Sequence, residues 1–386
     1  MGGIFHSLSR WWRGRPKSYR TEAEAEGAFW GDFTARWIVS GIIPPWADVR
    51  LAISQAIALG HRDRVLGGEL ENLSRKLRFL RDALHRVSSQ VQQGPTRVLE
   101  LGCGAGFLSL EMGRQGAEVL GIDISPGQII VARYFSKNGM HWPESLYPTY
   151  QGLTFRPSAF RPPEYEILDL NREQPRGSFD VIFAHDAVHH IASAEDLMGK
   201  LDPLLRSGGW VLLIDHQETE EGRRSSDALR GALADYCGRW TIEMPLADVP
   251  RAEPYDQKVC FPPLLGKEVM QGLGDWLRRE GFPLSRVSEA TAETVPPPWP
   301  SKESSFEGVG KRDLGRRLRH VAQVLGYEEV MLETAFEPWR EELVSLRPEG
   351  MDWHTFYALR AKAEDEVLAK SPGLGEFFYL RARKRR

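Results

Sequence analysis

The stretch that decides the fold is VLELGCGAGF, residues 98–107. It opens with an apolar run that has the composition of a buried strand, and it carries glycines at the alternate positions 102, 104 and 106. Glycine is needed where a chain turns tightly or where a ligand approaches the backbone closely. The stretch therefore predicts a strand, a ligand-binding loop and a helix that begins at Phe107. A plain tight turn between strand and helix is the structural alternative.

Short β-rich runs alternate with helices on the C-terminal side of this stretch. Strands are expected over residues 97–101, 118–122, 165–168, 179–184 and 210–214. Helices are expected over residues 107–115, 128–138 and 195–205. Repeated strand–helix–strand units imply a parallel sheet that is covered by helices on both faces. The predicted fold class is therefore α/β.

Residues 1–94 are predicted to form an N-terminal helical region or lid. Between Leu66 and Val87 the apolar residues recur at spacings of four and three, which marks one face of a helix. We expect this helix to pack on the main domain rather than to form a short coiled coil. Residues 4–17 are also amphipathic, with tryptophans beside arginines. A lid is favoured there over contact with a membrane surface, to which such a helix is also suited.

The segments after the fifth strand carry weaker patterns. The core is expected over residues 95–290, with part of 217–280 as an insertion, and residues 373–386 are expected to be a final core strand and a basic tail. Residues 291–372 are expected to be a helical insertion that forms an acceptor cap before that last strand. The smaller expected elements are helices over 226–236, 266–279, 339–346 and 353–370, a sixth strand over 282–287 and a stiff linker over 295–300.

Charge and cysteine content exclude several classes of protein. The formal net charge of -3 provides no general attraction to nucleic acid, so DNA is not an expected partner and RNA is disfavoured. The three cysteines are far apart and lack C-x-x-C spacing, which disfavours a disulfide framework and a zinc site. No apolar run approaches the roughly 18 residues that span a bilayer. A cytoplasmic protein is expected, with peripheral membrane contact through residues 4–17 as the alternative.

A single carboxylate adds a second signal for a nucleoside ligand. Asp123 ends the second expected strand, roughly 20 residues after the glycine loop, where a carboxylate reaches ribose hydroxyls from the adjacent strand. A dinucleotide fingerprint requires G-x-G-x-x-G, but Phe107 stands at the third glycine position and the last glycine is Gly106. There is also no P-loop lysine. These departures count against a nicotinamide-dependent oxidoreductase and against phosphate transfer.

The spacing E-x-G-x-G-x-G resembles motif I of the class I S-adenosylmethionine (SAM) dependent methyltransferases. The resemblance extends over residues 95–215 and the final strand, and includes FDVIFAHDAVHHI and LLRSGGWVLLID as the strand-four and strand-five segments. It implies a Rossmann-like seven-stranded sheet, with SAM as cofactor. In the family the glycine loop approaches the methionine part and ribose, Asp123 matches the residue that holds the ribose hydroxyls, and Asp169 matches one near the adenine amino group. The implied cofactor-binding residues are Glu100, Gly102, Cys103, Gly104, Gly106, Asp123, Ile124, Asp169, Leu170 and His185.

Candidates for a catalytic base follow strands four and five. They are His185, His189 and His216, with Asp186 and His190 beside them. For His189 and His190 a structural role at the strand–helix junction is the favoured interpretation, and Asp186 is also placed to cap the following helix. Although His and Asp together are metal ligands, the family pattern explains the segment, and no metal is expected.

The acceptor is the least determined part. In this fold elements outside the common sheet usually bind it, and the long extra regions favour a small or medium organic molecule, such as a specialised metabolite or lipid-like compound. Methylation of a protein, peptide or RNA and a non-catalytic SAM-binding regulator are the alternatives. Aromatic residues are candidates for an apolar pocket, although core packing is the more common role: Trp30, Phe33, Trp37, Trp46, Trp299, Trp353, Phe356 and Tyr357.

Overall fold

A computed structural model describes most of the chain. The described residues are 22–60, 76, 79–80, 83–87, 94–138, 160–191, 193–217, 222–240, 263–281, 287–294, 297, 313–336, 341–371 and 375–386. The amphipathic segment 4–17, the expected strand residues 282–286 and Trp299 therefore lie outside the described part.

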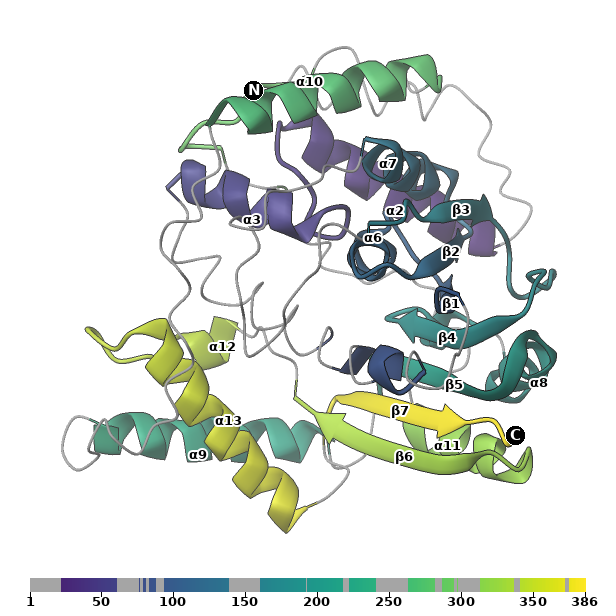
Figure 1. Ribbon diagram of the computed structural model, residues 1–386. Helices are drawn as coiled ribbons and strands as arrows, with labels where there is room; N and C mark the ends of the chain where they lie inside the picture. Colours follow the sequence, from purple (N-terminus) through teal and green to yellow (C-terminus); the bar gives the residue numbers. More distant parts are fainter. Residues whose placement is uncertain are drawn as a thin grey trace.

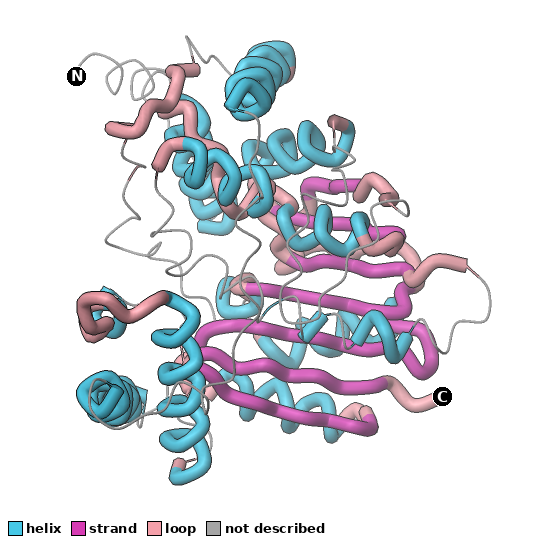
Figure 2. The backbone as a smooth tube through the Cα atoms, turned by 60° about the vertical axis from the view of Figure 1, so that its left-hand side comes forward, coloured by secondary structure: helices cyan, strands magenta, loops and turns pink. Residues whose placement is uncertain are grey.

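Within the described residues, seven strands form one mixed sheet with the order β3-β2-β1-β4-β5-β7-β6 (Figures 1 and 2). The strands are β1 Arg97–Leu101, β2 Glu118–Asp123, β3 Glu164–Ile167, β4 Phe179–His185, β5 Leu205–His216, β6 Glu328–Ala335 and β7 Phe377–Arg383. Strands β1 to β5 are parallel, and β7 is antiparallel to β5 and β6. The strand order reverses between β1 and β4, and in open α/β sheets ligands bind at the carboxyl ends beside such a reversal. The predicted seven-stranded Rossmann-like sheet is confirmed.

Helices cover both faces of the sheet (Figure 1). One face is covered by α6 Phe107–Arg114 and α7 Pro126–Lys137, with α2 Glu22–Val39, α3 Val49–Ala58 and α10 Pro263–Arg279 packed around α7 and one another. The other face is covered by α8 Ala194–Leu201 and α11 Leu314–Val324. Short 3₁₀ turns, η4 Val188–His190 and η5 Asp202–Leu204, follow β4 and α8. Both faces of β1 and β4 are buried, which explains their continuous apolar runs.

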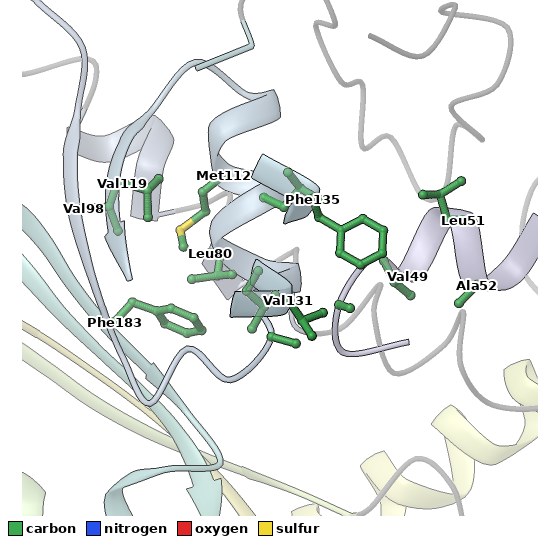
Figure 3. Packing of buried hydrophobic residues seen from close by; sticks show 14 of the residues in the cluster. Val49, Leu51, Ala52, Leu80, Val98, Met112, Val119, Val131, Phe135 and Phe183 are labelled. Carbon is green, nitrogen blue, oxygen red and sulfur yellow. The ribbon is translucent and has the colours of Figure 1, made fainter. Parts of the chain in front are cut away.

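The described part of residues 66–87 is helical and packs on the main domain. Leu80, Leu84 and Val87 are buried in the same core cluster as Val98 of β1 and Phe183 of β4. Figure 3 shows Leu80 beside Val98 and Met112 of α6. This packing is the one that the sequence predicts in preference to a coiled coil.

One strand, β6, lies in a segment for which the sequence predicts no strand, while the strand expected over 282–287 falls almost entirely outside the described residues. β6 spans Glu328–Ala335, inside the segment 291–372 for which the sequence predicts a helical insertion, so that prediction is wrong for these residues. Glu, Met, Leu and Ala dominate β6, and all of them favour helices. Pairing with β7, in which Leu332 lies opposite Leu380, overrides this preference. The other elements described in this segment are helices: α11, α12 Glu341–Val344 and α13 Trp353–Lys370.

Three helices form a small unit beside the sheet: α9 Gly222–Trp240, α12 Glu341–Val344 and α13 Trp353–Lys370 (Figure 1). Leu233, Phe356 and Leu359 are among the buried residues of its separate core. α9 follows the carboxyl end of β5, while α12 and α13 connect the carboxyl end of β6 to the start of β7. His216, Phe377 and Ala335 are neighbours in the sheet register, so these connections all leave the sheet at the edge where parallel strands end.

Candidate active site

The glycine loop, residues 102–106, joins β1 to α6 in a backbone conformation that requires glycine. Gly102 has φ of 60° and Gly106 has φ of 90°, both in the left-handed region. A Cβ on Gly102 would lie 2.3 Å from the Cβ of Ala187, and one on Gly106 would lie 2.5 Å from the phenolic oxygen of Tyr165. The loop is therefore pressed against the turn after β4 on one side and against β3 on the other.

Asp123 lies at the end of β2 and faces this loop, as the sequence predicts. Its carboxylate accepts hydrogen bonds from the backbone N–H of Gly104, at 2.9 Å, and of Ser125, at 2.7 Å. Burial raises the pKa of Asp123, the two N–H groups lower it, and the nearby carboxylate of Glu26 raises it further. The Asp123 side chain therefore holds the glycine loop in place through Gly104, and it also lies beside the loop as a possible ligand contact.

Glu100 lies beneath the loop. It is buried, and its carboxyl group is hydrogen-bonded to the hydroxyl of Ser109 in α6. Burial raises the pKa of Glu100 to about 8, although the bonds to Ser109 oppose the shift. At neutral pH the side chain is therefore mostly a neutral acid that ties β1 to the first turns of α6.

Two buried polar atoms beside the loop have no hydrogen-bond partner among the described residues. They are Oε1 of Gln128, in the first turn of α7, and Nε2 of His185, at the end of β4. Gln128 Oε1 lies 3.2 Å from the position of a Cβ on Gly104. Burial, and then Lys76, lower the pKa of His185 well below its ordinary value, so the imidazole is neutral. Since buried polar groups normally have partners, the loop fits a polar ligand such as a nucleoside.

Other implied cofactor residues lie around the same strand ends. Cys103 is buried, and burial raises the pKa of its thiol well above the ordinary value, so it is not a thiolate. Asp169 follows β3, and its Oδ1 accepts a hydrogen bond of 2.9 Å from the N–H of Asn171. The carbonyl of Leu170 accepts one of 2.6 Å from Lys200 Nζ. Ile124 packs against α2, where a Cβ on Gly27 would lie 3.2 Å from its Cγ2.

Residues 44–50 attach the N-terminal region to α6, the helix that follows the glycine loop. Arg50 pairs with Glu111 through two hydrogen bonds of 2.8 and 2.9 Å, and Arg114 pairs with Asp48 at 2.7 Å. All four side chains are buried. The N–H of Phe107, at the start of α6, donates to the carbonyl of Trp46 at 3.3 Å. Residues 44–50 therefore have a fixed position beside the loop.

A second cluster of polar side chains lies at the ends of β4 and β5, and Asp215 is its centre. One carboxylate oxygen accepts from the N–H groups of Val188, at 2.6 Å, and His189, at 3.1 Å. The other accepts from His216 N–H at 2.7 Å and lies 2.6 Å from the His189 ring. Asp215 is fully buried. It therefore caps η4, the role that the sequence suggests for Asp186, and gives His189 a structural partner.

Asp186 instead pairs with His216. Its Oδ1 lies 3.1 Å from His216 Nε2, and its backbone has φ of 53°, in the left-handed region that aspartate adopts more readily than most residues. The His216 ring packs 3.9 Å from the ring of Phe377 and is 22 % exposed. Asp186, His189 and Asp215 also present atoms within 4.8 Å of one another that are suited to a metal ion. Because Asp215 already accepts several N–H groups, hydrogen bonding accounts for the cluster, and the absence of a metal stays a prediction.

Among the aromatic candidates whose side chains the structure describes, Phe33, Trp37 and Phe356 are buried, and Trp46 and Tyr357 pack partly buried against the core. The side chain of Trp353 lies outside the described part. Phe33 and Trp46 stack at a centroid distance of 5.2 Å, and Trp37 meets Trp46 edge-on at 5.0 Å. Phe356 is fully buried in the core of the unit formed by α9, α12 and α13. Three residues of the site, Asp215, Gln128 and Glu26, were not predicted from the sequence. A polar residue that ends the apolar run of β5 is a signal for Asp215, whereas no pattern marks Glu26.

Comparisons with known proteins agree with this geometry. A protein family described as a methyltransferase domain matches residues 71–263. The ubiquinone biosynthesis O-methyltransferase of Xanthomonas euvesicatoria pv. vesicatoria is 28 % identical over 217 residues, which are 56 % of this chain and 73 % of that protein. The enzyme of the same name from a Bradyrhizobium species is 25 % identical over 170 residues, or 43 % of this chain and 58 % of that protein.

Similar solved structures are more distant in sequence. The plantazolicin methyltransferase BpumL in complex with S-adenosylhomocysteine (SAH) aligns with 88 % of this chain and 96 % of its own, at 15 % identity and a TM-score of 0.33. A phosphoethanolamine N-methyltransferase of Haemonchus contortus aligns with 88 % of this chain and 58 % of its own, at 13 % identity and a TM-score of 0.38.

Among the described residues, no helix is both long and apolar enough to cross a membrane.

Proposed function

The chain belongs to the class I SAM-dependent methyltransferase family, and from this premise we propose that it methylates a hydroxyl group of a small or medium organic molecule. The observation that carries the proposal is the Asp186–His216 pair, which lies at the carboxyl ends of β4 and β5 beside the glycine loop. Two sequence relatives named above are O-methyltransferases, which agrees with a hydroxyl acceptor.

The residues that hold SAM in this proposal surround the glycine loop. Asp123 accepts from the ribose hydroxyls, and the Gly102–Gly106 backbone follows the ribose and the methionine part. Gln128 Oε1 and His185 Nε2 supply the polar atoms that lack partners within the described structure. SAM supplies an electrophilic methyl group on a sulfonium, so the protein mainly binds, orients and excludes water.

His216 accepts the proton of the acceptor hydroxyl. When Nε2–H of His216 donates a hydrogen bond to the Asp186 carboxylate, Nδ1 is the basic atom of the ring. With SAM bound, the hydroxyl oxygen would take the methyl group as the carbon–sulfur bond breaks, and the sulfonium would become the neutral thioether of SAH. The hydroxyl proton would pass to His216, and Asp186 would stabilise the resulting imidazolium.

The α9–α12–α13 unit is the proposed acceptor cap. It connects to the sheet next to His216, because α9 follows β5 and α13 precedes Phe377, the register partner of His216. An acceptor that reaches His216 would therefore lie next to this unit, and contact with it would select an organic molecule over a protein or RNA.

Calorimetric titration with SAM and SAH tests the cofactor, and transfer from methyl-labelled SAM tests the acceptor. The acceptor panel pairs each phenol or catechol with the aniline of the same shape, and it includes peptides and transfer RNA. We expect micromolar binding of both nucleosides and label transfer to a hydroxyl compound but not to its matched amine.

The other outcomes would each count against a defined part of the proposal. Labelled peptide or RNA would replace the small acceptor. Transfer to the anilines alone would remove the hydroxyl assignment and the need for His216 as a base. Failure of folded protein to bind SAM or SAH would refute the function itself.

A further inference from the structure

We propose that Glu26 of α2 is a further cofactor-binding residue, whose carboxylate contacts the cationic methionine end of SAM. This inference rests on the proposed function, since it assigns an additional residue to the same site. The other proposed cofactor-binding residues belong to the glycine loop or to the strands and helices of the α/β core and the residues that follow them. Glu26 instead belongs to α2, which precedes that core in the chain.

The position of α2 is fixed by close backbone packing on the turn that follows β2. A Cβ on Gly27 would lie 3.1 Å from the carbonyl oxygen of Ile124, and one on Gly31 would lie 3.2 Å from Ser125 Oγ. The Ser125 hydroxyl donates a hydrogen bond to the carbonyl of Gly27. Because the two glycines lie one helical turn apart, this face of α2 approaches the residues next to Asp123 directly.

Glu26 lies between Asp123, at the end of β2, and His190, which follows β4. It is only 7 % exposed, and its carboxylate is close enough to Asp123 for the two charges to interact. On the other side its Oε1 lies 3.9 Å from Nδ1 of His190, which follows β4. Strand β1 lies between β2 and β4, and the glycine loop begins where β1 ends. A carboxylate between Asp123 and His190 is therefore next to the start of the loop.

The charge of this position matches the ligand. If SAM binds with its ribose at Asp123 and its methionine part toward β4, the atoms between these two points would lie next to the Glu26 carboxylate. That part of SAM carries two positive groups, the sulfonium and the α-ammonium, against one α-carboxylate, so its net charge is positive. Trp30 Nε1 donates to Glu26 within α2 and so helps to orient the carboxylate. An anion that is held in a largely buried place interacts with a cation more strongly than it would in water.

Three ligands separate a direct contact from an effect on the fold. SAM carries both positive groups, SAH carries only the α-ammonium, and 5′-methylthioadenosine keeps the ribose and adenine but has neither. Glu26→Gln removes the charge while it keeps the shape and an acceptor for Trp30. Asp32→Asn is the matched control, because it removes one carboxylate from the same helix where that carboxylate pairs with Arg36.

Calorimetric titration of the full chain at pH 7.5 should show SAM binding about tenfold weaker in Glu26→Gln, with methylthioadenosine binding changed less than twofold. The control variant should match the wild type for all three ligands. If SAH affinity is retained, the contact is to the sulfonium; if it falls together with that of SAM, the contact is to the α-ammonium.

Two results would overturn the inference. One is unchanged SAM affinity in Glu26→Gln. The other is an equal loss for SAM and methylthioadenosine, which would mean that Glu26 only maintains the fold of α2. A wild-type protein that binds none of the three ligands would instead refute the proposed function, so the two failures are distinguishable.

Discussion

Aspartates lie at the carboxyl ends of the strands in two arrangements. The first is at the ends of β1 and β2, the second is at the ends of β4 and β5, and the groups around the aspartates differ between them. Asp123 accepts hydrogen bonds from the backbone N–H groups of Gly104 and Ser125, and a second carboxylate, Glu26, lies nearby. Asp215 and Asp186 instead face the rings of His189 and His216. The first arrangement is suited to binding a cation-bearing nucleoside, and the second is suited to moving a proton. The two meet at the contact between Gly102 and Ala187.

The largest expected effect comes from Asp215, because removing it would break the second arrangement entirely. Asp215→Ala would leave the buried N–H groups of Val188 and His189 and the His189 ring without their acceptor. We expect a loss of about 3–5 kcal/mol in unfolding free energy, which urea denaturation measures. Asp227→Ala, at an exposed position of α9, is the control and should change it by less than about 0.5 kcal/mol. A loss below about 1 kcal/mol would show that Asp215 does not hold the turn.

The next effect tests binding at the first arrangement. Asp123→Ala removes the acceptor for Gly104 N–H and for the ribose, so we expect SAM affinity to fall about 100-fold, or about 2.7 kcal/mol, by calorimetry. Glu118→Gln, at the opposite end of the same strand, is the control and should bind SAM as the wild type does. If both variants bind SAM equally well, Asp123 does not contact the cofactor.

The third effect sharpens the difference between binding and proton transfer. His216→Gln removes the proposed base, and we expect kcat to fall at least tenfold while the affinity for SAM is unchanged. The pH dependence of kcat/KM should also lose its acidic limb, because the imidazole whose protonation would stop the transfer has been removed. His320→Gln, on the exposed face of α11, should leave both unchanged. An acidic limb that persists in His216→Gln would assign the base to another group.

The smallest effect concerns the acid beneath the glycine loop. Folding raises the pKa of Glu100 from 4.5 to about 8, so the folded state keeps a proton that the unfolded state has released. The stabilising effect of this proton is complete below pH 4.5 and is lost as the pH rises toward 8. Between pH 6.5 and 7.5 the wild type should therefore lose about 1 kcal/mol relative to Glu100→Gln, as measured by denaturation at each pH. Parallel pH profiles for the two proteins would mean that Glu100 is ionised in the folded state.

Local sequence determined the first arrangement. An apolar strand, a loop that only glycines can form and a carboxylate at the end of the next strand are all encoded within 26 residues, 98–123, so the sequence alone identifies strand, loop, helix and Asp123. The helix over residues 353–370 was also predictable to its bounds. In these segments spacing, glycine conformation and burial all favour the same structure.

Only tertiary structure decided the rest. β6 has the composition of a helix and becomes a strand because β7 provides its hydrogen-bond partners. The pairing of Asp186 with His216 and the placement of Glu26 beside Asp123 join residues that are 30 and 97 positions apart, and no local pattern specifies such contacts. Physically, a side chain at a strand end acquires its partners from the neighbouring strands and covering helices. The sequence by itself therefore determined the loop and the carboxylate of the proposed nucleoside site, whereas the order of the strands decided which residues surround them.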